Sequence, residues 1–290
     1  MLDDDKRKQA IDLYDRFTHE GMDRRDFFTR MTAIAGSAAA ASTLIASIAA
    51  SPAAAAIIPA DDKRLTTRTM AFTGAASAYR AYVAEPRSRS LKASVMVIHE
   101  NRGLTEHIRD VARRVALAGY RAVAVDFLSP GGGTPTNEDA AREAIGKLDL
   151  AKSTTDAVAM LRELAGSSRG GKVGAVGFCW GGAFVNRLAV AAGADLDAGV
   201  SYYGPAPDPS EATKVQSPLL IHLAGLDERV NRSAYPWVTA LRAANKPVIY
   251  QEYDGINHAF NNDTSTERYD KAAADLAWER TLRFFKRNLA

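Results

Sequence analysis

KVGAVGFCWGG, residues 172–182, is the stretch that decides the fold, because a glycine turn joins an apolar strand pattern to a helix. Its first five residues predict a buried strand, and the residues after the turn, as far as position 191, predict a helix. Between them, Gly177, Cys179 and Gly181 have the Gly-x-nucleophile-x-Gly form of a nucleophile elbow. Glycines are needed on both sides because the turn is tight and the helix packs close to the strand. We therefore predict that Cys179 stands above a sheet at a helix N-terminus, where the helix dipole favours a thiolate.

From about Leu65 to the C-terminus, short β-rich runs alternate with amphipathic helical patterns. Continuous apolar runs are typical of strands that are buried on both faces. The alternation predicts a mostly parallel central sheet with helices on both faces, and together with the elbow it predicts the α/β-hydrolase fold. The strands are expected at 66–72 and 78–83 (an antiparallel pair), 94–98, 121–125, 172–176, 198–203, 219–223 and 248–253, and the helices at 106–117, 137–147, 153–164, 181–191, 234–243 and 269–289.

Composition narrows the class of protein. Of the 290 residues, 47% are hydrophobic and 24% are charged, as in a globular protein with a full core. The formal net charge of +3 comes without a long Lys/Arg block, so we expect no nucleic-acid partner. A single cysteine excludes an intrachain disulfide and a cysteine-based metal cluster. The alternative for Cys179 is an inert buried residue, because a free cysteine is often part of the core.

A thiol nucleophile needs a histidine base and an acid that orients the base. In this fold the chain order is nucleophile, acid, histidine, and only His222 and His258 follow the elbow. His222 lies inside an apolar strand pattern, which favours a satisfied core histidine, whereas His258 follows a strand in a glycine-containing loop. Asp227 ends the strand pattern before it and is the expected acid. The alternatives, Glu228 and Asp254, are each more typical of a solvated charge.

Acyl transfer also needs two N–H donors for the oxyanion that develops on the carbonyl. Trp180, directly after the nucleophile, is expected to supply one, and Asn101, in the loop after the 94–98 strand, is the candidate for the other. Glu100 beside it is unexpected, because a carboxylate there repels a negative intermediate. The alternative role for Glu100 is an ion pair with Arg102. No histidine or carboxylate cluster has metal-ligand spacing, so we expect no metal and no cofactor.

Residues 1–58 have the layout of an export leader. A charged start ends in paired arginines at 24–25, an uncharged Ala-rich stretch follows at 31–58, and it holds the small residues Ala53–Ala56 that signal peptidases accept. This layout predicts a twin-arginine signal, a periplasmic or exported protein, the twin-arginine export machinery as a partner, and no stable membrane span in the mature form. The alternatives are a membrane anchor at 31–58 and a helical or disordered terminus with an accidental arginine pair. The remaining unit is one domain at 65–290.

From about Val83 to the C-terminus the chain resembles the dienelactone hydrolase family. The resemblance is carried by the cysteine elbow, by Glu100, by Asp227 and by Asn257–Phe260, which includes His258. The segments 97–104 and 269–278 look like an exported subgroup of that family. The resemblance implies that the elbow cysteine, Asp227 and His258 form a catalytic triad, and that Glu100 helps to activate the thiol when substrate binds.

The family's best-known members hold a substrate carboxylate with two arginines. The resemblance implies that Arg142 matches one of them. The other is expected just after Phe260, where this chain has Asn262 within an Asn-Asn-Asp run. A neutral amide there removes a charge-assisted contact. The implied substrate-binding set is therefore Arg142, Phe260 and Asn262, with the identity of the natural substrate left open.

Together these residues predict a cofactor-free hydrolase of small esters or lactones, of the carboxymethylenebutenolidase type that the resemblance implies. One alternative is a non-catalytic small-molecule binding protein of the cell envelope that keeps the pocket. Another is an acyltransferase on the same fold. A thiol peroxidase is disfavoured because the chain has no second cysteine to resolve a sulfenic acid.

Overall fold

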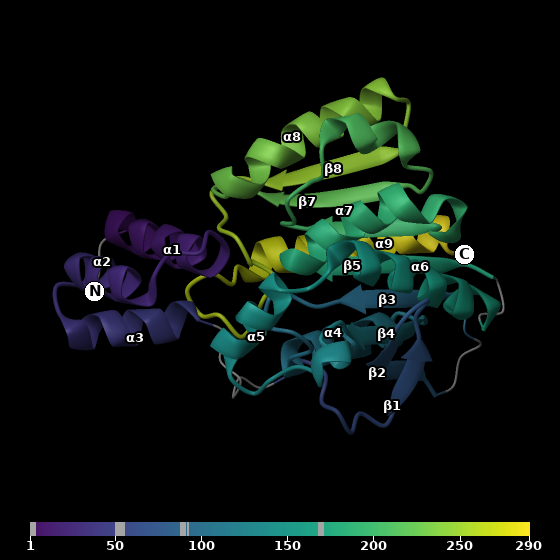
Figure 1. Ribbon diagram of the computed structural model, residues 1–290, viewed down its shortest axis with the longest axis horizontal. Coiled ribbons are helices and arrows are strands. Elements are labelled where there is room, and N and C mark those ends of the chain that lie inside the picture. The colour runs from purple at the N-terminus through teal and green to yellow at the C-terminus, as the bar shows by residue number, and fades with distance from the viewer. Residues whose placement is uncertain (1–3, 50–55, 88–90, 92, 168–170) are drawn as a thin grey trace.

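The computed structural model describes residues 4–49, 56–87, 91, 93–167 and 171–290, and it contains an eight-stranded sheet (Figure 1). The strand order is β1-β2-β4-β3-β5-β6-β7-β8; β2 is antiparallel to both β1 and β4, and the other neighbours are parallel. The predicted fold class and the predicted antiparallel pair are confirmed. The strands are β1 (Leu65–Thr73), β2 (Ala78–Pro86), β3 (Ser94–Ile98), β4 (Arg121–Asp126), β5 (Val173–Phe178), β6 (Ala198–Tyr202), β7 (Leu219–Ala224) and β8 (Val248–Tyr253).

Helices cover both faces of the sheet. Every residue of β3, β5, β6 and β7 is buried, as expected for parallel strands between two helical layers. Buried side chains of α4 and α9 form the core on one face, and those of α6, α7 and α8 form the core on the other. The helices of this domain are α4 (Glu106–Leu117), α5 (Glu138–Gly146), α6 (Leu150–Gly166), α7 (Trp180–Ala192), α8 (Glu228–Ala243) and α9 (Lys271–Asn288).

One helix starts well before its predicted position. The apolar pattern predicts a helix at 234–243, but α8 begins at Glu228. Its start is fixed by a polar cap, because the Asp227 carboxylate accepts a hydrogen bond from the Val230 N–H at 3.1 Å. The polar first turns of α8 carry no apolar period, so periodicity alone misses them. The cap also fixes the position of Asp227 at the end of β7.

Close backbone contacts hold the turn at Cys179. This residue has φ 54° and ψ −112°, a conformation that L-residues rarely adopt. A Cβ on Gly177 would lie 2.1 Å from the Gly181 carbonyl oxygen, and a Cβ on Gly181 would lie 2.4 Å from the Ile98 carbonyl oxygen. Both positions therefore need glycine, and the second contact presses the first turn of α7 against the end of β3.

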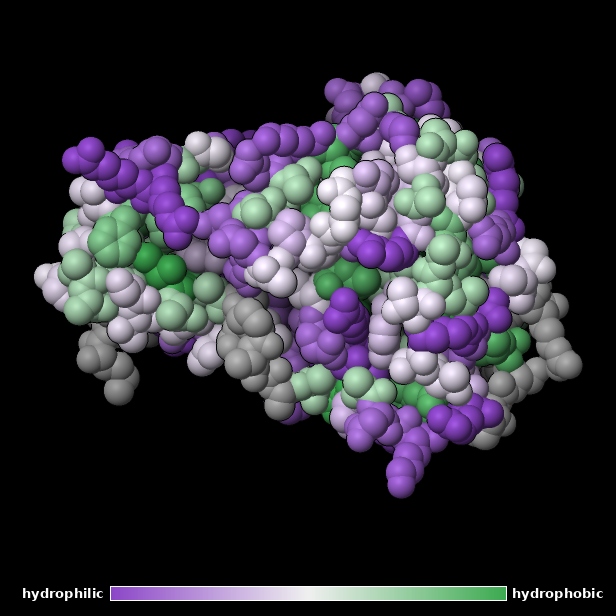
Figure 2. Space-filling model, turned by 60° about the horizontal axis from the view of Figure 1, so that its bottom comes forward, coloured by the Kyte–Doolittle hydropathy of each residue, from purple (hydrophilic) through white to green (hydrophobic). Residues whose placement is uncertain are grey.

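The residues before the domain form an N-terminal segment, residues 4–49, that lies beside the carboxyl ends of the strands (Figure 1). Its helices are α1 (Asp4–His19), α2 (Arg24–Ala35) and α3 (Ala38–Ile48). Their buried apolar side chains form a cluster separate from the two cores that flank the sheet. The segment is thus a packed unit of its own, and apolar residues gather on part of its surface (Figure 2).

The described part of the chain has no single helix with the length and hydropathy of a membrane span. Only α2 and α3 taken together reach that length and composition, and the two helices meet at an angle of 104°. Of the small residues expected at the end of the leader, Ala53–Ala55 lie outside the described residues.

The elbow contacts generate a stability prediction. Replacing Gly181 with alanine forces a methyl group against the Ile98 carbonyl, so we expect G181A to lower the free energy of unfolding by about 3 kcal/mol, at the upper end of overpacking costs. Urea denaturation measures the change. The matched control is G146A at the end of α5, because a Cβ there meets nothing within 4 Å and should cost little. Equal losses in the two variants would contradict the tight-turn account.

Candidate active site

Three predicted side chains come together at the carboxyl ends of the strands. Cys179 follows β5, Asp227 follows β7, and His258 lies in the loop after β8. His258 Nδ1 lies 2.5 Å from Asp227 Oδ2, and a ring nitrogen of His258 lies within 4.8 Å of Cys179 Sγ. All three residues are buried, and His258 Nε2 makes no hydrogen bond to the described residues. The loops therefore arrange a thiol, an imidazole and a carboxylate in the order that nucleophilic catalysis uses.

The electrostatics of this group favour a charged histidine. Burial alone would lower the pKa of His258, because a desolvated imidazolium is costly. The charge and hydrogen bond of Asp227, with a smaller contribution from Cys179, outweigh burial and raise the pKa of His258 well above its usual range. Burial raises the pKa of Asp227, but His258 reverses this effect and lowers it overall. His258 therefore keeps its proton at neutral pH.

Two backbone N–H groups near Cys179 are the oxyanion donors that the sequence predicts. Trp180 is the first residue of α7, a position whose N–H has no acceptor inside the helix. Asn101 lies in the loop after β3, and its N–H bonds to no other backbone group of the described residues. Asn101 and Cys179 line the same small cavity. One predicted donor thus directly follows Cys179 in the chain, and the other comes from a loop that lines the same cavity.

Glu100 lies in the same cavity, and among the described residues its carboxylate makes no ion pair. The Asn262 side-chain amide donates to Glu100 Oε2 at 2.7 Å, and Glu100 Oε1 is buried without a hydrogen-bond partner among the described residues. Arg102 instead pairs with Glu138 at 3.4 Å and donates to the Tyr14 hydroxyl at 2.5 Å. Within the described part of the chain, the ion pair between Glu100 and Arg102 considered from the sequence is not formed.

Two predicted substrate-binding side chains lie outside this cavity. Arg142, on α5, pairs with Asp139, and its guanidinium stacks on the Phe17 ring at 4.7 Å. Phe260 is fully buried and packs against the Tyr203 ring at a centroid distance of 5.4 Å. Neither side chain lines the cavity around the thiol. Asn262, the third predicted substrate-binding residue, contacts the site through the hydrogen bond that its side-chain amide donates to the Glu100 carboxylate.

His222 is buried in β7, as a core histidine is expected to be. Its ring nitrogens lie 3.1 Å from the Thr281 hydroxyl and 2.9 Å from the Tyr253 hydroxyl. Burial lowers the pKa of His222 to about 3, so this imidazole stays neutral. Both its nitrogens are satisfied away from the thiol.

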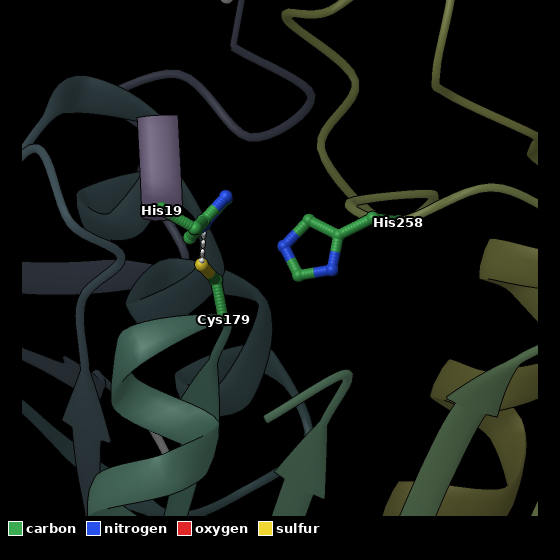
Figure 3. Close-up of side chains that lie close together, drawn as sticks. All are labelled: His19, Cys179 and His258. Atoms are coloured by element: carbon green, nitrogen blue, oxygen red, sulfur yellow. Dashed lines mark hydrogen bonds between the residues drawn. The ribbon is translucent and has the colours of Figure 1, made fainter. Parts of the chain in front are cut away.

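A residue that the sequence did not indicate lies within hydrogen-bond distance of the nucleophile. His19, at the end of α1, has Nε2 at 3.1 Å from Cys179 Sγ (Figure 3). Its ring meets the His258 ring edge to face at a centroid distance of 5.0 Å. His19 precedes Cys179 by 160 positions, and no motif links the two. Only the docking of the N-terminal segment brings this imidazole to the site.

One set of described residues has donor atoms for a metal ion. Donor atoms of His19, Cys179 and His258 all lie within 4.8 Å of one another. A thiolate and two imidazoles suit a thiophilic ion such as Zn²⁺. Two of these donors are the groups that the elbow geometry provides for nucleophilic attack, so an ion bound there would block the nucleophile. Two of its three members, Cys179 and His258, belong to the candidate triad, so the set does not form a separate site.

A mostly parallel sheet with a nucleophile elbow after β5, and with a carboxylate and a histidine after β7 and β8, defines an α/β-hydrolase-fold protein. The sequence model of the dienelactone hydrolase family matches residues 79–289. The chain therefore belongs to the dienelactone hydrolase family and is a dienelactone hydrolase-like hydrolase. The matched region begins within β2 and does not cover the N-terminal segment.

Individual relatives agree with this assignment. A protein named "Putative carboxymethylenebutenolidase" from Escherichia coli O157:H7 is 33% identical over 223 residues, which are 71% of this chain and 81% of that protein. One of the same name from Saccharolobus solfataricus is 29% identical over 245 residues, 72% of this chain and 93% of that one. The crystal structure of a "Putative Dienelactone Hydrolase" from Klebsiella pneumoniae aligns with a TM-score of 0.69 at 26% identity, covering 77% of this chain and 98% of its own.

The pair of His258 and Asp227 generates a titration prediction. Removing the carboxylate in D227N takes away the main influence that raises the pKa of His258 and leaves burial, which lowers it. We expect the pKa of His258 to fall by more than about one unit, the equivalent of about 1.4 kcal/mol. An NMR titration of the histidine ring signals measures it. D254N is the matched control, because Asp254 is exposed on the same side of the domain near the end of β8; a similar fall in both variants would rule out Asp227 as the orienting acid.

Proposed function

We propose that the protein hydrolyses small esters or lactones through a covalent thioester on Cys179, with His258 as acid and base and Asp227 orienting His258. The observation that carries the proposal is the strained turn at Cys179, with the thiol facing a buried histidine whose other nitrogen bonds a buried carboxylate. Backbone strain persists where the surrounding structure enforces it, and it is concentrated at functional sites.

In the proposed reaction, the Cys179 thiolate attacks the carbonyl carbon and the carbonyl π electrons move to oxygen. The N–H groups of Asn101 and Trp180 hold that oxyanion. The intermediate collapses with loss of the alkoxide, which takes the proton from the His258 imidazolium and leaves a thioester. The now neutral His258 removes a proton from water, and the hydroxide attacks the thioester. Collapse expels the Cys179 thiolate with His258 protonated, and releases the carboxylic acid product.

Glu100 has a supporting role in this proposal. Its carboxylate lies in the cavity with Cys179, and one of its oxygens is buried without a hydrogen-bond partner among the described residues. A buried carboxylate oxygen that accepts no hydrogen bond is costly, so a hydrogen-bond donor beside it is favoured. We propose that Glu100 accepts the thiol proton when substrate displaces its neighbours, as the family resemblance implies, and that it returns this proton to the Cys179 thiolate when product leaves. The Asn262 amide holds the other oxygen and so fixes the orientation of the carboxylate.

The residues around the thiol argue against a substrate carboxylate held by the family's two arginines. The Arg142 guanidinium pairs with Asp139 and stacks on the Phe17 ring, and the Asn262 side-chain amide donates to Glu100. We therefore propose an ester or lactone whose recognition does not require the two-arginine clamp. The relatives carry the name carboxymethylenebutenolidase, and hydrolysis of an enol-lactone is therefore the reaction with which this chain's activity is best compared.

We also propose that residues 1–58 direct export through the twin-arginine machinery and that the mature enzyme is periplasmic. Arg24 and Arg25 are exposed at the start of α2, where a receptor can reach them. Arg24 makes one surface ion pair, with Asp139, and its side chain is still 78% exposed. Surface ion pairs of this kind contribute little, so this pair does not prevent recognition.

Hydrolysis is tested with short-chain aryl esters and enol-lactones. C179A should lower kcat/KM by at least about 10³, because removing a nucleophile leaves only the oxyanion donors and binding. The measurement is made on the full chain and on a chain that begins at Ala56, which retains both cores of the domain. C179S is the matched control, because it keeps an oxygen nucleophile on the elbow. Turnover that is the same with and without Cys179 refutes the proposal, and no turnover in any form favours the binding-protein alternative.

Export is tested by replacing both arginines with lysine. Receptors that read twin arginines depend on guanidinium geometry, which an ammonium does not provide. R24K with R25K should therefore abolish the periplasmic fraction of the protein after cell fractionation. R30K is the matched control, because Arg30 is an exposed arginine of the same helix. A normal periplasmic fraction in the double variant would contradict the export assignment.

A further inference from the structure

The mouth of the candidate active site is filled by the N-terminal segment. The cavity that remains among Cys179, His258 and Glu100 measures about 10 Å³, and residues of α1 close it from the outside. That volume is near the limit for a single water molecule, so no ester can enter it. The His19 imidazole occupies the space directly over the thiol (Figure 3). The covered form therefore cannot bind the substrates of the proposed reaction.

One side of the mouth anchors the segment through Arg268. The Arg268 guanidinium is buried and pairs with the Asp15 carboxylate of α1 at 3.1 Å. Arg268 Nε and the Ser265 hydroxyl both donate to the Ile48 carbonyl oxygen at the end of α3, at 3.1 and 2.6 Å. A carbonyl at a helix C-terminus carries partial negative charge, which suits a guanidinium. Two separate helices of the segment thus converge on one buried cation of the domain.

The other side of the mouth holds the segment through the loop after β3. The Asn101 side chain donates to the Thr18 carbonyl oxygen at 3.3 Å, and Arg102 donates to the Tyr14 hydroxyl at 2.5 Å. Asn101 is also a proposed oxyanion donor. The segment therefore contacts the same loop that the reaction needs, and it bridges the site from Asn101 to Arg268.

His19 occupies the site as a neutral group. Burial lowers the pKa of His19 well below its usual range, and the charge on the neighbouring His258 lowers it further. A neutral imidazole over the thiol completes the burial of Cys179 without adding a second positive charge. The Asp15 carbonyl oxygen holds the other ring nitrogen at 2.7 Å, which fixes the orientation of the ring.

We propose that the N-terminal segment is an intramolecular inhibitor that docks on the catalytic mouth, with His19 over the nucleophile and Asp15 on Arg268, and that the enzyme is active only when this segment is released or removed. The inference rests on the proposed function, because it names the regulation of the same site. The segment has its own apolar cluster, so it can leave the domain as a packed unit. A protein that is exported in folded form with this segment in place would have no enzymatic activity until the segment is displaced.

The experiment measures the rate at which iodoacetamide alkylates Cys179, followed by intact mass. It compares the full chain, a chain that begins at Ala56, and the full-length variants D15N and H19A. The shorter chain keeps the backbone N–H groups of Ile57 and Ile58 that bind the Asp110 carboxylate, so its domain retains these contacts. The matched control is D12N, because Asp12 is exposed on the same helix. Circular dichroism and thermal unfolding verify that each form is folded.

Alkylation depends on the fraction of molecules whose site is open, so a segment docked in nine molecules of ten slows it about tenfold. We expect the shorter chain to be alkylated at least about tenfold faster than the full chain, D15N and H19A to lie between them, and D12N to match the full chain. Equal rates in the full and shorter chains would overturn the proposal. So would a shorter chain that is alkylated faster but hydrolyses esters more slowly than the full chain, because the segment would then assist catalysis.

The two proposals fail in different ways. If the shorter chain is alkylated faster but no form hydrolyses esters, the inhibitory docking stands and the proposed reaction fails. If every form hydrolyses esters at the same Cys179-dependent rate, the reaction stands and the inhibitory docking fails.

Discussion

The backbone conformation of Cys179 is the constraint on which the rest of the site depends. A φ of 54° is tolerated there because Gly177 and Gly181 let the strand, the turn and the helix approach to distances that any side chain would block. The same approach places the first turn of α7 against the Ile98 carbonyl at the end of β3, so the Asn101 loop lies beside the thiol. One tight turn therefore sets the position of the nucleophile, of the helix N-terminus behind it and of the proposed oxyanion donors.

Much of this arrangement could be predicted from the sequence, because it follows from local patterns and chain order. Buried strands of a parallel sheet are continuous apolar runs, and loops at their carboxyl ends converge whatever their separation in the chain. For this reason the sequence predicts Asp227 and His258 as partners, and in the structure Asp227 Oδ2 and His258 Nδ1 lie 2.5 Å apart. The start of α8 could not be predicted in this way. A polar N-cap determines it, and the apolar periodicity of a sequence carries no information about such caps.

The residues that sequence reasoning missed are those whose roles depend on tertiary docking. His19 reaches the thiol only because α1 packs across the mouth, held by Arg268 and by Asn101. Arg142 was expected at the substrate, but Asp139 and the Phe17 ring hold it outside the cavity. Neither outcome leaves a periodicity or a motif in the chain. The same contacts connect the proposed export of the protein to its chemistry, because the segment that carries the arginine pair also covers the nucleophile.

The central claim is that Cys179 forms a covalent acyl intermediate, and trapping that intermediate tests it most directly. The chain that begins at Ala56 is mixed with an excess of an aryl ester, quenched in acid after a short delay and analysed by intact-protein and peptide mass spectrometry. The account predicts a mass increase equal to the acyl group, located on the peptide that contains Cys179 and labile to hydroxylamine, as a thioester is. Substrate consumption with the acyl group on another residue would contradict it.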